Sequence, residues 1–333
     1  MRSSRMTRPK VHIIVLGGTI TMAPQKAGGI APSISGADLV AAVPALSDVA
    51  DITVATPFLV PGASLSFAQM RQVDALIDEA LAGAAHGVVI VQGTDTIDET
   101  AFLLDLTHRH AGPVVITGAM RGASAAGADG AANLLAAVTV AASPSARVLG
   151  ALVVLNDEIH AARFVAKLHK ALPSAFGSPG FGPLGHVIEG SVRIALRLVR
   201  FDAGLAGPMA EAAPVALVSA GLGGDDRMIS AVPGLGYKGL VIEAMGAGHL
   251  PGNLVSASEE VAKVMPVILA SRVAGGPIFA STYGFPGSEI DLLGRGLLSA
   301  GFLSAHKARL LLALSLGAGH ALPDIAKAFA AFQ

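Results

Sequence analysis

Short runs of apolar, β-branched residues recur along this chain and alternate with stretches whose apolar residues follow a helical period. One such stretch, Phe67 to Ala85, is apolar at Met70, Val73, Leu76 and Ile77, close to the helical repeat. Continuous hydrophobic strands separated by helices are typical of a parallel sheet covered on both faces. We therefore expect an α/β fold. The expected strands are Val11 to Leu16, Ile52 to Leu59, Gly87 to Val91, Pro113 to Gly118, Val148 to Leu155, Pro214 to Ala220, Gly239 to Ala244 and Pro277 to Ser281.

The length of 333 residues exceeds one ordinary hydrophobic core and predicts two domains. Between Leu198 and Pro214 there is neither a sustained period nor a strong strand signal, which is typical of a linker. We expect a larger N-terminal domain over 1–198, with about five strands in a parallel-rich sheet flanked by helices. A linker over 199–213 and a smaller C-terminal α/β domain over 214–333, with about three strands, follow it.

Composition narrows the class of protein. The formal net charge is -1 and no basic stripe is present, which argues against nucleic acid as a partner. The absence of cysteine excludes disulfides, a thiolate metal site and a cysteine nucleophile. Apolar runs such as Leu134 to Ala142 are shorter than the ~18 residues that span a membrane, and the N-terminus lacks a signal-peptide core. We expect a cytoplasmic protein that acts on a small molecule.

Two threonine-bearing strings each follow a strand-like run. They are Gly17-Gly18-Thr19-Ile20-Thr21 and Gln92-Gly93-Thr94-Asp95-Thr96-Ile97-Asp98-Glu99-Thr100. Ligands of open α/β sheets bind beyond the carboxyl ends of the strands, and a hydroxyl there becomes a nucleophile when a base stands beside it. The glycines let a substrate approach the backbone closely and leave N–H groups to bind an oxyanion.

Each string also fits a purely structural interpretation. Gly17-Gly18-Thr19 fits a tight turn, and Thr96 with Glu99 fits a helix capping box. Capping leaves Thr94 and Asp95 unexplained.

A base is also needed. Lys167 lies in a mostly apolar stretch, where desolvation favours the neutral amine, yet it equally fits a surface lysine whose stem packs on the protein. Lys170 satisfies the same argument.

The chain resembles the bacterial-type L-asparaginase family from Ile13 to about Leu312. Beyond the two threonine strings, the resemblance rests on Gly118-Ala119-Met120-Arg121, Ala128-Asp129-Gly130, Asn133-Leu134, Asn156-Asp157, Gly182-Pro183-Leu184-Gly185 and Lys307-Ala308-Arg309. It implies hydrolysis of the side-chain amide of asparagine by a homotetramer of intimate dimers, each subunit with a large and a small α/β domain. It implies no metal and no organic cofactor.

The resemblance also implies roles for particular residues. Thr19 corresponds to the nucleophile that forms an acyl-enzyme and releases ammonia. Thr94, Asp95 and Lys167 correspond to a second triad, in which Thr94 activates water and Lys167, rather than Lys170, sets its proton affinity. Asp95 would also hold the substrate α-ammonium group, and the carbonyl of Ala119 would meet the amide nitrogen. Gly18 and Gly93 are expected to line the substrate.

The chain departs from the family after the nucleophile. The family carries a tyrosine there whose hydroxyl contacts the nucleophilic threonine, whereas this chain has Ala27-Gly28-Gly29-Ile30-Ala31-Pro32, with Ile30 at the matching position. Loss of an acid–base contribution of ~10²–10⁴-fold predicts slow turnover unless Tyr283, Thr21 or Ser33 substitutes. The Gly- and Pro-containing segment from Thr21 to Gly36 is interpreted as a lid, with an ordered surface loop as the alternative.

Two further departures concern the substrate's charged ends. Gly62, Ala63 and Ser64 match the family's α-carboxylate site, with Ala63 replacing its serine and Ser64 offering the nearby hydroxyl. Ser64 and Ser66 equally fit helix capping before Phe67. His249 replaces an asparagine that reaches from the partner subunit and is expected to line that interface. Glu289 is expected to contact the ammonium group across the same interface.

The sequence therefore predicts an L-asparaginase, and because asparagine and glutamine differ by one methylene, worth ~1–3 kcal/mol, some glutaminase activity is compatible with it. An amino-acid-binding or regulatory protein that has lost turnover is the alternative, supported by the missing tyrosine. The amidase subunit of a tRNA-dependent amidotransferase is disfavoured because only ten residues precede the first strand.

Overall fold

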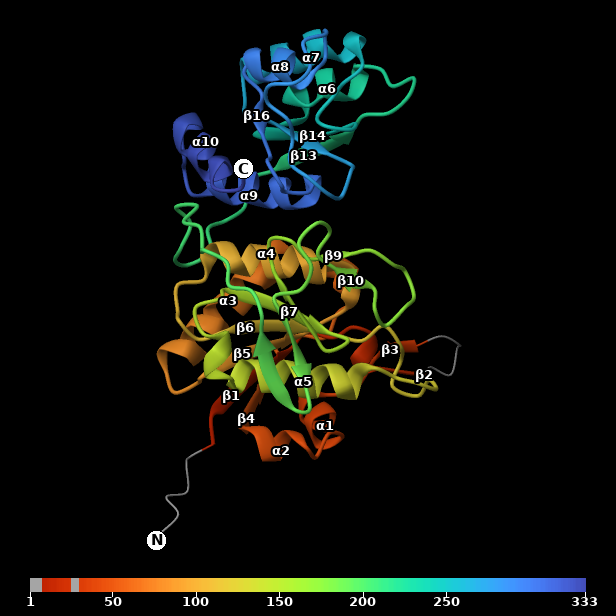
Figure 1. The fold of residues 1–333 in the computed structure, drawn as a ribbon, viewed down its shortest axis with the longest axis vertical. Coiled ribbons are helices and arrows are strands. Elements are labelled where there is room, and N and C mark those ends of the chain that lie inside the picture. The colour runs from red at the N-terminus through yellow and green to blue at the C-terminus, as the bar shows by residue number, and fades with distance from the viewer. Residues whose placement is uncertain (1–7, 25–29) are drawn as a thin grey trace. The chain divides into compact units, whose positions relative to one another are not determined.

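A computed structural model describes residues 8–24 and 30–333 of the chain. The chain divides into two compact units, residues 1–200 and residues 201–333, and each has a sheet of its own (Figure 1). The division falls inside the proposed linker, 199–213, where the structure has no helix or strand.

The first unit is built on an eight-stranded sheet in the order β12-β11-β8-β7-β6-β5-β1-β4. The five strands from β4 to β7 in this order are parallel, whereas β8, β11 and β12 extend the sheet in antiparallel fashion. β2 pairs with β3 and β9 with β10 in separate two-stranded ladders. The strands are β1 Lys10–Val15, β2 Met22–Pro24, β3 Ile30–Pro32, β4 Asp51–Ala55, β5 Gly87–Val91, β6 Val114–Thr117, β7 Ala151–Leu155, β8 Glu158–Ala161, β9 Ala166–Lys167, β10 Phe176–Gly177, β11 Gly185–Ile188 and β12 Ser191–Ile194.

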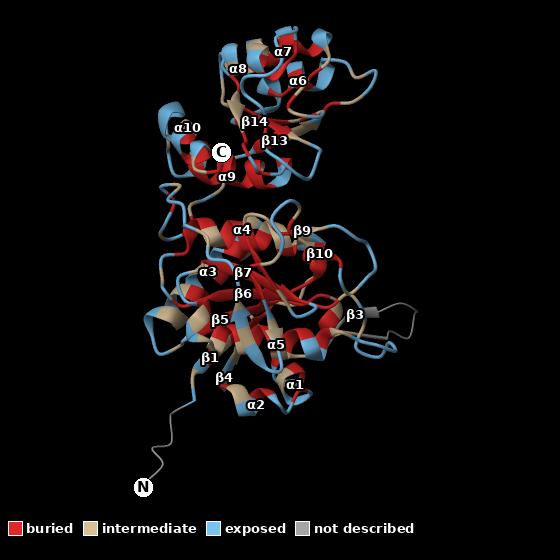
Figure 2. Ribbon diagram, viewed as in Figure 1, coloured by how far each residue is buried: buried red, intermediate tan, exposed pale blue. Residues whose placement is uncertain are grey.

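Helices cover both faces of this sheet, with α3 and α4 on one face and α5 on the other (Figure 1). Every residue of β5 and β7 is buried, as expected of central strands in a covered parallel sheet (Figure 2). The helices are α1 Gly36–Ala41, α2 Leu46–Val49, α3 Phe67–Ala82, α4 Ile97–Thr107 and α5 Gly130–Ala142, with 3-10 turns η1 Thr19–Thr21, η2 Gly62–Ser64, η3 Thr94–Thr96 and η4 Pro144–Ala146.

The second unit has a four-stranded parallel sheet in the order β13-β14-β15-β16. The helix α9 carries nine buried residues and packs on β13, β14 and β15. The elements are β13 Val215–Ser219, α6 Arg227–Ala231, η5 Pro233–Leu235, β14 Gly239–Ala244, η6 Gly252–Leu254, α7 Val255–Ala262, β15 Val267–Ser271, α8 Glu289–Gly294, β16 Leu298–Ser299, α9 Ala305–Gly317 and α10 Leu322–Ala330.

The expected α/β class is confirmed, and seven of the eight expected strands overlap a strand of the structure. The prediction of a strand over Pro277 to Ser281 is wrong, because this segment is irregular and its Ile278 and Phe279 N–H groups bond to the Gly301 and Ala247 carbonyls instead of to a ladder. β15, which lies between β14 and β16, is an apolar run that was not among the expected strands. None of the helices in the described part of the chain is long and apolar enough to cross a bilayer.

Candidate active site

Three glycines bring the loops after β1, β4 and β5 into direct backbone contact. A Cβ added to Gly18 would lie 2.2 Å from the Gly93 nitrogen, and one added to Gly62 would lie 2.6 Å from the Gly93 oxygen. Gly18 also has a φ of +87°, which favours glycine. Because Thr19 and Thr94 directly follow Gly18 and Gly93, this packing places the two threonine strings side by side.

Lys167 connects Thr94 and Asp95. Its Nζ donates to Thr94 Oγ1 at 2.9 Å and to Asp95 Oδ1 at 2.7 Å. Thr94 is buried, the Lys167 side chain is 18% exposed and that of Asp95 is 66% exposed. A hydroxyl, an amine and a carboxylate thus form one hydrogen-bonded row that opens to solvent at Asp95. Lys170 is exposed and takes no part in this row.

Thr19 begins the short turn η1 and is half-buried. Among the described residues, no side chain hydrogen-bonds its hydroxyl. Thr21, one of the groups expected to replace the missing tyrosine, is fully buried and donates its hydroxyl to the Gly18 carbonyl at 2.9 Å. Thr21 therefore stabilises the turn that carries Thr19, and its hydroxyl proton is donated to the Gly18 carbonyl and not to Thr19.

The capping interpretation of Thr96 is wrong. No side-chain hydrogen bond caps α4, and the Thr96 hydroxyl instead donates to the Gly62 carbonyl at 3.0 Å while accepting from Gln92 Nε2 at 3.2 Å. The hydroxyl turns away from its own helix because the loop of Gly62 lies against Gly93. Thr96 thus provides a second link between the loops after β4 and β5.

Ala119 lies in a loop held by Asp129 and Asn133. The Asp129 carboxylate accepts from the N–H groups of Met120 and Arg121, each at 2.9 Å, and Asn133 Nδ2 donates to the Gly118 carbonyl at 3.0 Å. A Cβ on Gly118 would lie 3.3 Å from Thr94 Cγ2, so this loop borders Thr94. Asp129 and Asn133 were not among the predicted site residues, although a carboxylate and an amide four residues apart at the start of α5 are a signal in the sequence.

The two serines before α3 behave differently. Ser66 caps α3, forming a capping box with Gln69, so the capping alternative holds for this residue. Ser64 ends the turn η2, makes no cap and is exposed, as is Ala63. Within the described part of the chain, the Ser64 hydroxyl makes no hydrogen bond, and it lies close in sequence to the buried Gly62.

The remaining predicted residues, His249 and Glu289, lie in the second unit and contact each other. His249 Nε2 is 3.2 Å from Glu289 Oε2, and Glu289 Oε1 accepts from the N–H groups of Thr282 and Tyr283 at 2.9 and 2.7 Å. Burial acts to raise the pKa of Glu289, but these backbone hydrogen bonds and His249 outweigh it and hold the pKa below its usual value. Within this chain the fully buried carboxylate is occupied by protein donors, and contact with a substrate stays a prediction.

The expected lid is described in part. Its β2 and β3 form an antiparallel ladder that pairs Met22 with Pro32 and Pro24 with Ile30. Ala27, Gly28 and Gly29, which belong to the stretch without the family's tyrosine, lie outside the described residues. Whether the segment closes over a substrate stays a prediction.

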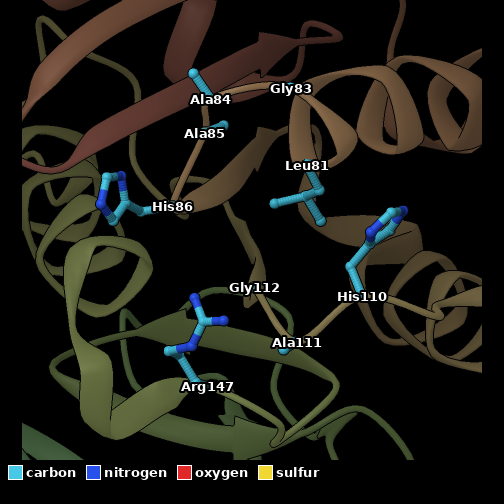
Figure 3. A pocket seen from close by; sticks show the side chains of 9 residues that line it. All are labelled: Leu81, Gly83, Ala84, Ala85, His86, His110, Ala111, Gly112 and Arg147. Carbon is cyan, nitrogen blue, oxygen red and sulfur yellow. The ribbon is translucent and has the colours of Figure 1, made fainter.

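A separate cavity of about 410 Å³ lies near the amino ends of the strands β5 and β6, and Figure 3 shows the residues that line it. Its wall includes His86, which directly precedes β5, and Gly112, which comes shortly before β6, together with His110, Leu81 and Arg147. Thr94 follows the other end of β5. None of the predicted site residues lines this cavity.

The fold and the site define a two-unit α/β protein whose Thr, Lys and Asp side chains meet at the carboxyl ends of parallel strands. Residues 10–200 match the family described as "Asparaginase, N-terminal", and residues 214–329 match "Glutaminase/Asparaginase C-terminal domain". The chain belongs to the asparaginase family.

Individual relatives match over almost the whole chain. A probable L-asparaginase of Deinococcus radiodurans is 36% identical over 96% of this chain and 97% of its own length. A glutaminase-asparaginase of Pseudomonas fluorescens biotype A is 31% identical over 92% of this chain and 86% of its own. The crystal structure of a probable cytoplasmic L-asparaginase from Campylobacter jejuni superposes with a TM-score of 0.87 at 30% identity, covering 98% of this chain and all of that one.

Proposed function

We propose that this protein hydrolyses the side-chain amide of L-asparagine, giving L-aspartate and ammonia, with some activity on glutamine. The observation that carries the proposal is the contact of Lys167 Nζ with both Thr94 and Asp95, next to the Gly18–Gly93 contact. The probable L-asparaginase and the glutaminase-asparaginase among its relatives support the same substrate class.

In the proposed reaction, Thr19 Oγ1 attacks the amide carbon and its proton leaves with the departing nitrogen as ammonia. The resulting ester joins Thr19 to the aspartyl group. A water molecule, oriented by the Thr94 hydroxyl and its Lys167 partner, then attacks this ester, restores the Thr19 hydroxyl and releases aspartate. Each step breaks one bond and forms another at the carbon that was the amide carbon of the substrate.

Other residues position the substrate in this proposal. The exposed Asp95 carboxylate holds the α-ammonium group, and the Ala119 carbonyl meets the amide nitrogen. Ser64 and the backbone at Gly18, Gly62, Ala63 and Gly93 bind the α-carboxylate. His249 and Glu289 complete the site from a neighbouring copy of the chain in a homotetramer of intimate dimers. We place the protein in the cytoplasm, in line with the cytoplasmic relative.

Ammonia release tests the proposal directly. The wild type, Thr19→Ala and Thr94→Ala are each supplied with L-asparagine, L-glutamine and the D-isomers. We expect the wild type to release ammonia from L-asparagine, and each substitution to lower kcat by at least ~10²-fold, because each removes a hydroxyl used in bond making or proton transfer.

Two results would contradict this proposal. Binding of asparagine without ammonia release would instead identify an amino-acid-binding protein. Full activity in Thr19→Ala would show that another group is the nucleophile, and mass spectrometry of the enzyme trapped with substrate would locate it.

A further inference from the structure

A hydrogen-bonded group of three side chains, of which His160 and Ser178 are buried and Glu158 is partly exposed, lies next to the ladder that carries Lys167. His160, on β8, has its Nδ1 3.0 Å from Ser178 Oγ and its Nε2 3.2 Å from Glu158 Oε2. The exposed fractions of His160 and Ser178 are 1% and 7%.

The hydrogen bonds fix the direction in which each group donates. A carboxylate accepts hydrogen bonds, so the His160 Nε2–H donates to Glu158, which leaves Nδ1 as an acceptor for the Ser178 hydroxyl. Burial lowers the pKa of His160 against the raising effect of Glu158, and the charge of His186 lowers it further. The two hydrogen bonds therefore need a neutral His160 imidazole, and the lowered pKa of His160 favours that form.

The ladder that holds Lys167 is too short to be rigid by itself. β9 and β10 have two residues each, with Lys167 opposite Phe176 and Ala166 opposite Gly177. An isolated pair of strands is marginally stable even when longer, so this one depends on its attachments. Asp98 Oδ2 accepts from the Lys167 N–H at 3.4 Å, a long hydrogen bond.

Ser178 supplies a second attachment, to the main sheet. It directly follows β10, and His160 lies on β8 opposite Val153 of β7, within the eight-stranded sheet. We propose that His160 and Ser178 are positioning residues that fasten the β9–β10 ladder to the sheet and thereby hold Lys167 Nζ against Thr94 and Asp95. This inference rests on the proposed asparaginase activity of the same site.

The test combines variants of Ser178 with a variant of Lys167. Ser178→Ala removes the hydroxyl, Ser178→Thr retains one, and Ser258→Ala is the control because Ser258 is also buried, donates its hydroxyl to the Leu254 carbonyl at 2.8 Å and lies in the other unit. Thermal unfolding of the full-length variants shows which of them fold like the wild type. Each change is also made in a Lys167→Met background.

We expect Ser178→Ala to lower kcat for asparagine by about 10- to 100-fold, because a displacement of about 1 Å at a reacting group has effects of this size. KM should change less than kcat, Ser178→Thr should recover much of the loss, and Ser258→Ala should stay within about twofold of wild type. In the Lys167→Met background, Ser178→Ala should change the residual rate by less than about twofold, because both substitutions act through the Lys167 amino group.

Chemical labelling gives a readout that does not depend on turnover. Acetylation of Lys167 by acetic anhydride, followed by peptide mass spectrometry, should be faster in Ser178→Ala than in the wild type and unchanged in Ser258→Ala. An unchanged labelling rate together with unchanged kcat would overturn the inference, as would an equal loss of kcat in the Lys167→Met background. A wild type that releases no ammonia would refute the proposed function instead, and the labelling would still decide the positioning of Lys167.

Discussion

His108 is a buried imidazole immediately after α4. Burial, the largest cause, together with the charge of Arg200 lowers the pKa of His108 from 6.5 to about 4, against the opposing effect of a hydrogen bond with the Gly112 backbone. In the unfolded chain the same imidazole binds a proton near pH 6.5. Between these two values the unfolded state therefore holds one proton more than the folded state, so stability rises with pH across this window.

We predict that the free energy of unfolding falls as the pH is lowered from about 6.5 towards 4, with His108 contributing up to about 3 kcal/mol of the loss. Urea unfolding of the wild type and of His108→Gln at pH 7.5 and pH 5 measures this contribution. The wild type should lose about 1–2 kcal/mol more than the variant between the two pH values. Equal losses in both proteins would show that His108 is not the group responsible.

The fold decides which of the two candidate lysines, Lys167 or Lys170, contacts Thr94. Both were candidates from residue type and surroundings, and the resemblance to the family favoured Lys167. In the structure Lys167 Nζ contacts Thr94, which lies 73 positions earlier in the chain, whereas Lys170 is exposed. No local pattern encodes a contact over that separation, because it depends on how β9 lies against the loop after β5.

At the scale of elements, the site depends on how closely the loops after β1, β4 and β5 approach. The close packing at Gly18, Gly62 and Gly93 leaves no room for a side chain. Gly190 offers a matched comparison with Gly18, because its φ is also positive, at +67°, and an added Cβ there would meet nothing within 4 Å.

We predict that Gly190→Ala lowers the free energy of unfolding by about 1–2 kcal/mol, the cost of a left-handed backbone alone. Gly18→Ala should lower it by more than about 3 kcal/mol and abolish ammonia release, because its Cβ would lie 2.2 Å from the Gly93 nitrogen. Chemical unfolding and ammonia assays on both variants measure these effects. Similar values for the two variants would mean that the loops separate at little cost.

At the scale of the whole molecule, the chain has two units that carry different parts of the predicted site. Thr19, Thr94, Asp95 and Lys167 belong to the first unit, and His249 and Glu289 to the second. In the second unit, the His249 ring packs edge-on against Tyr283 and Phe285, with ring centroids 4.8 and 5.2 Å apart. Both Tyr283 and Phe285 are exposed. Exposed aromatic clusters commonly mark interfaces.

We predict that the protein in solution has a mass four times that of the 33.3 kDa chain, measured by light scattering. Phe285→Asp should reduce the assembled fraction and the ammonia release together, because it places a charge in the aromatic cluster. Leu222→Asp, at a fully exposed position of the same unit, should change neither. A fully active wild-type monomer would contradict the proposed assembly.

The sequence by itself determined the α/β class, most of the strands of the parallel sheet and the positions of Thr19 and Thr94 after them, because these follow from local periodicity and from strand-to-loop transitions. The predicted strand over Pro277 to Ser281 and the predicted helix cap at Thr96 were wrong, because backbone partners from other segments decide the local structure at both places. Only the tertiary structure decided that Gly18 and Gly93 touch, that Lys167 reaches Thr94, and that His160 holds Ser178. These contacts join different loops and strands, and their geometry is set by the packing of whole elements, which residue patterns do not record.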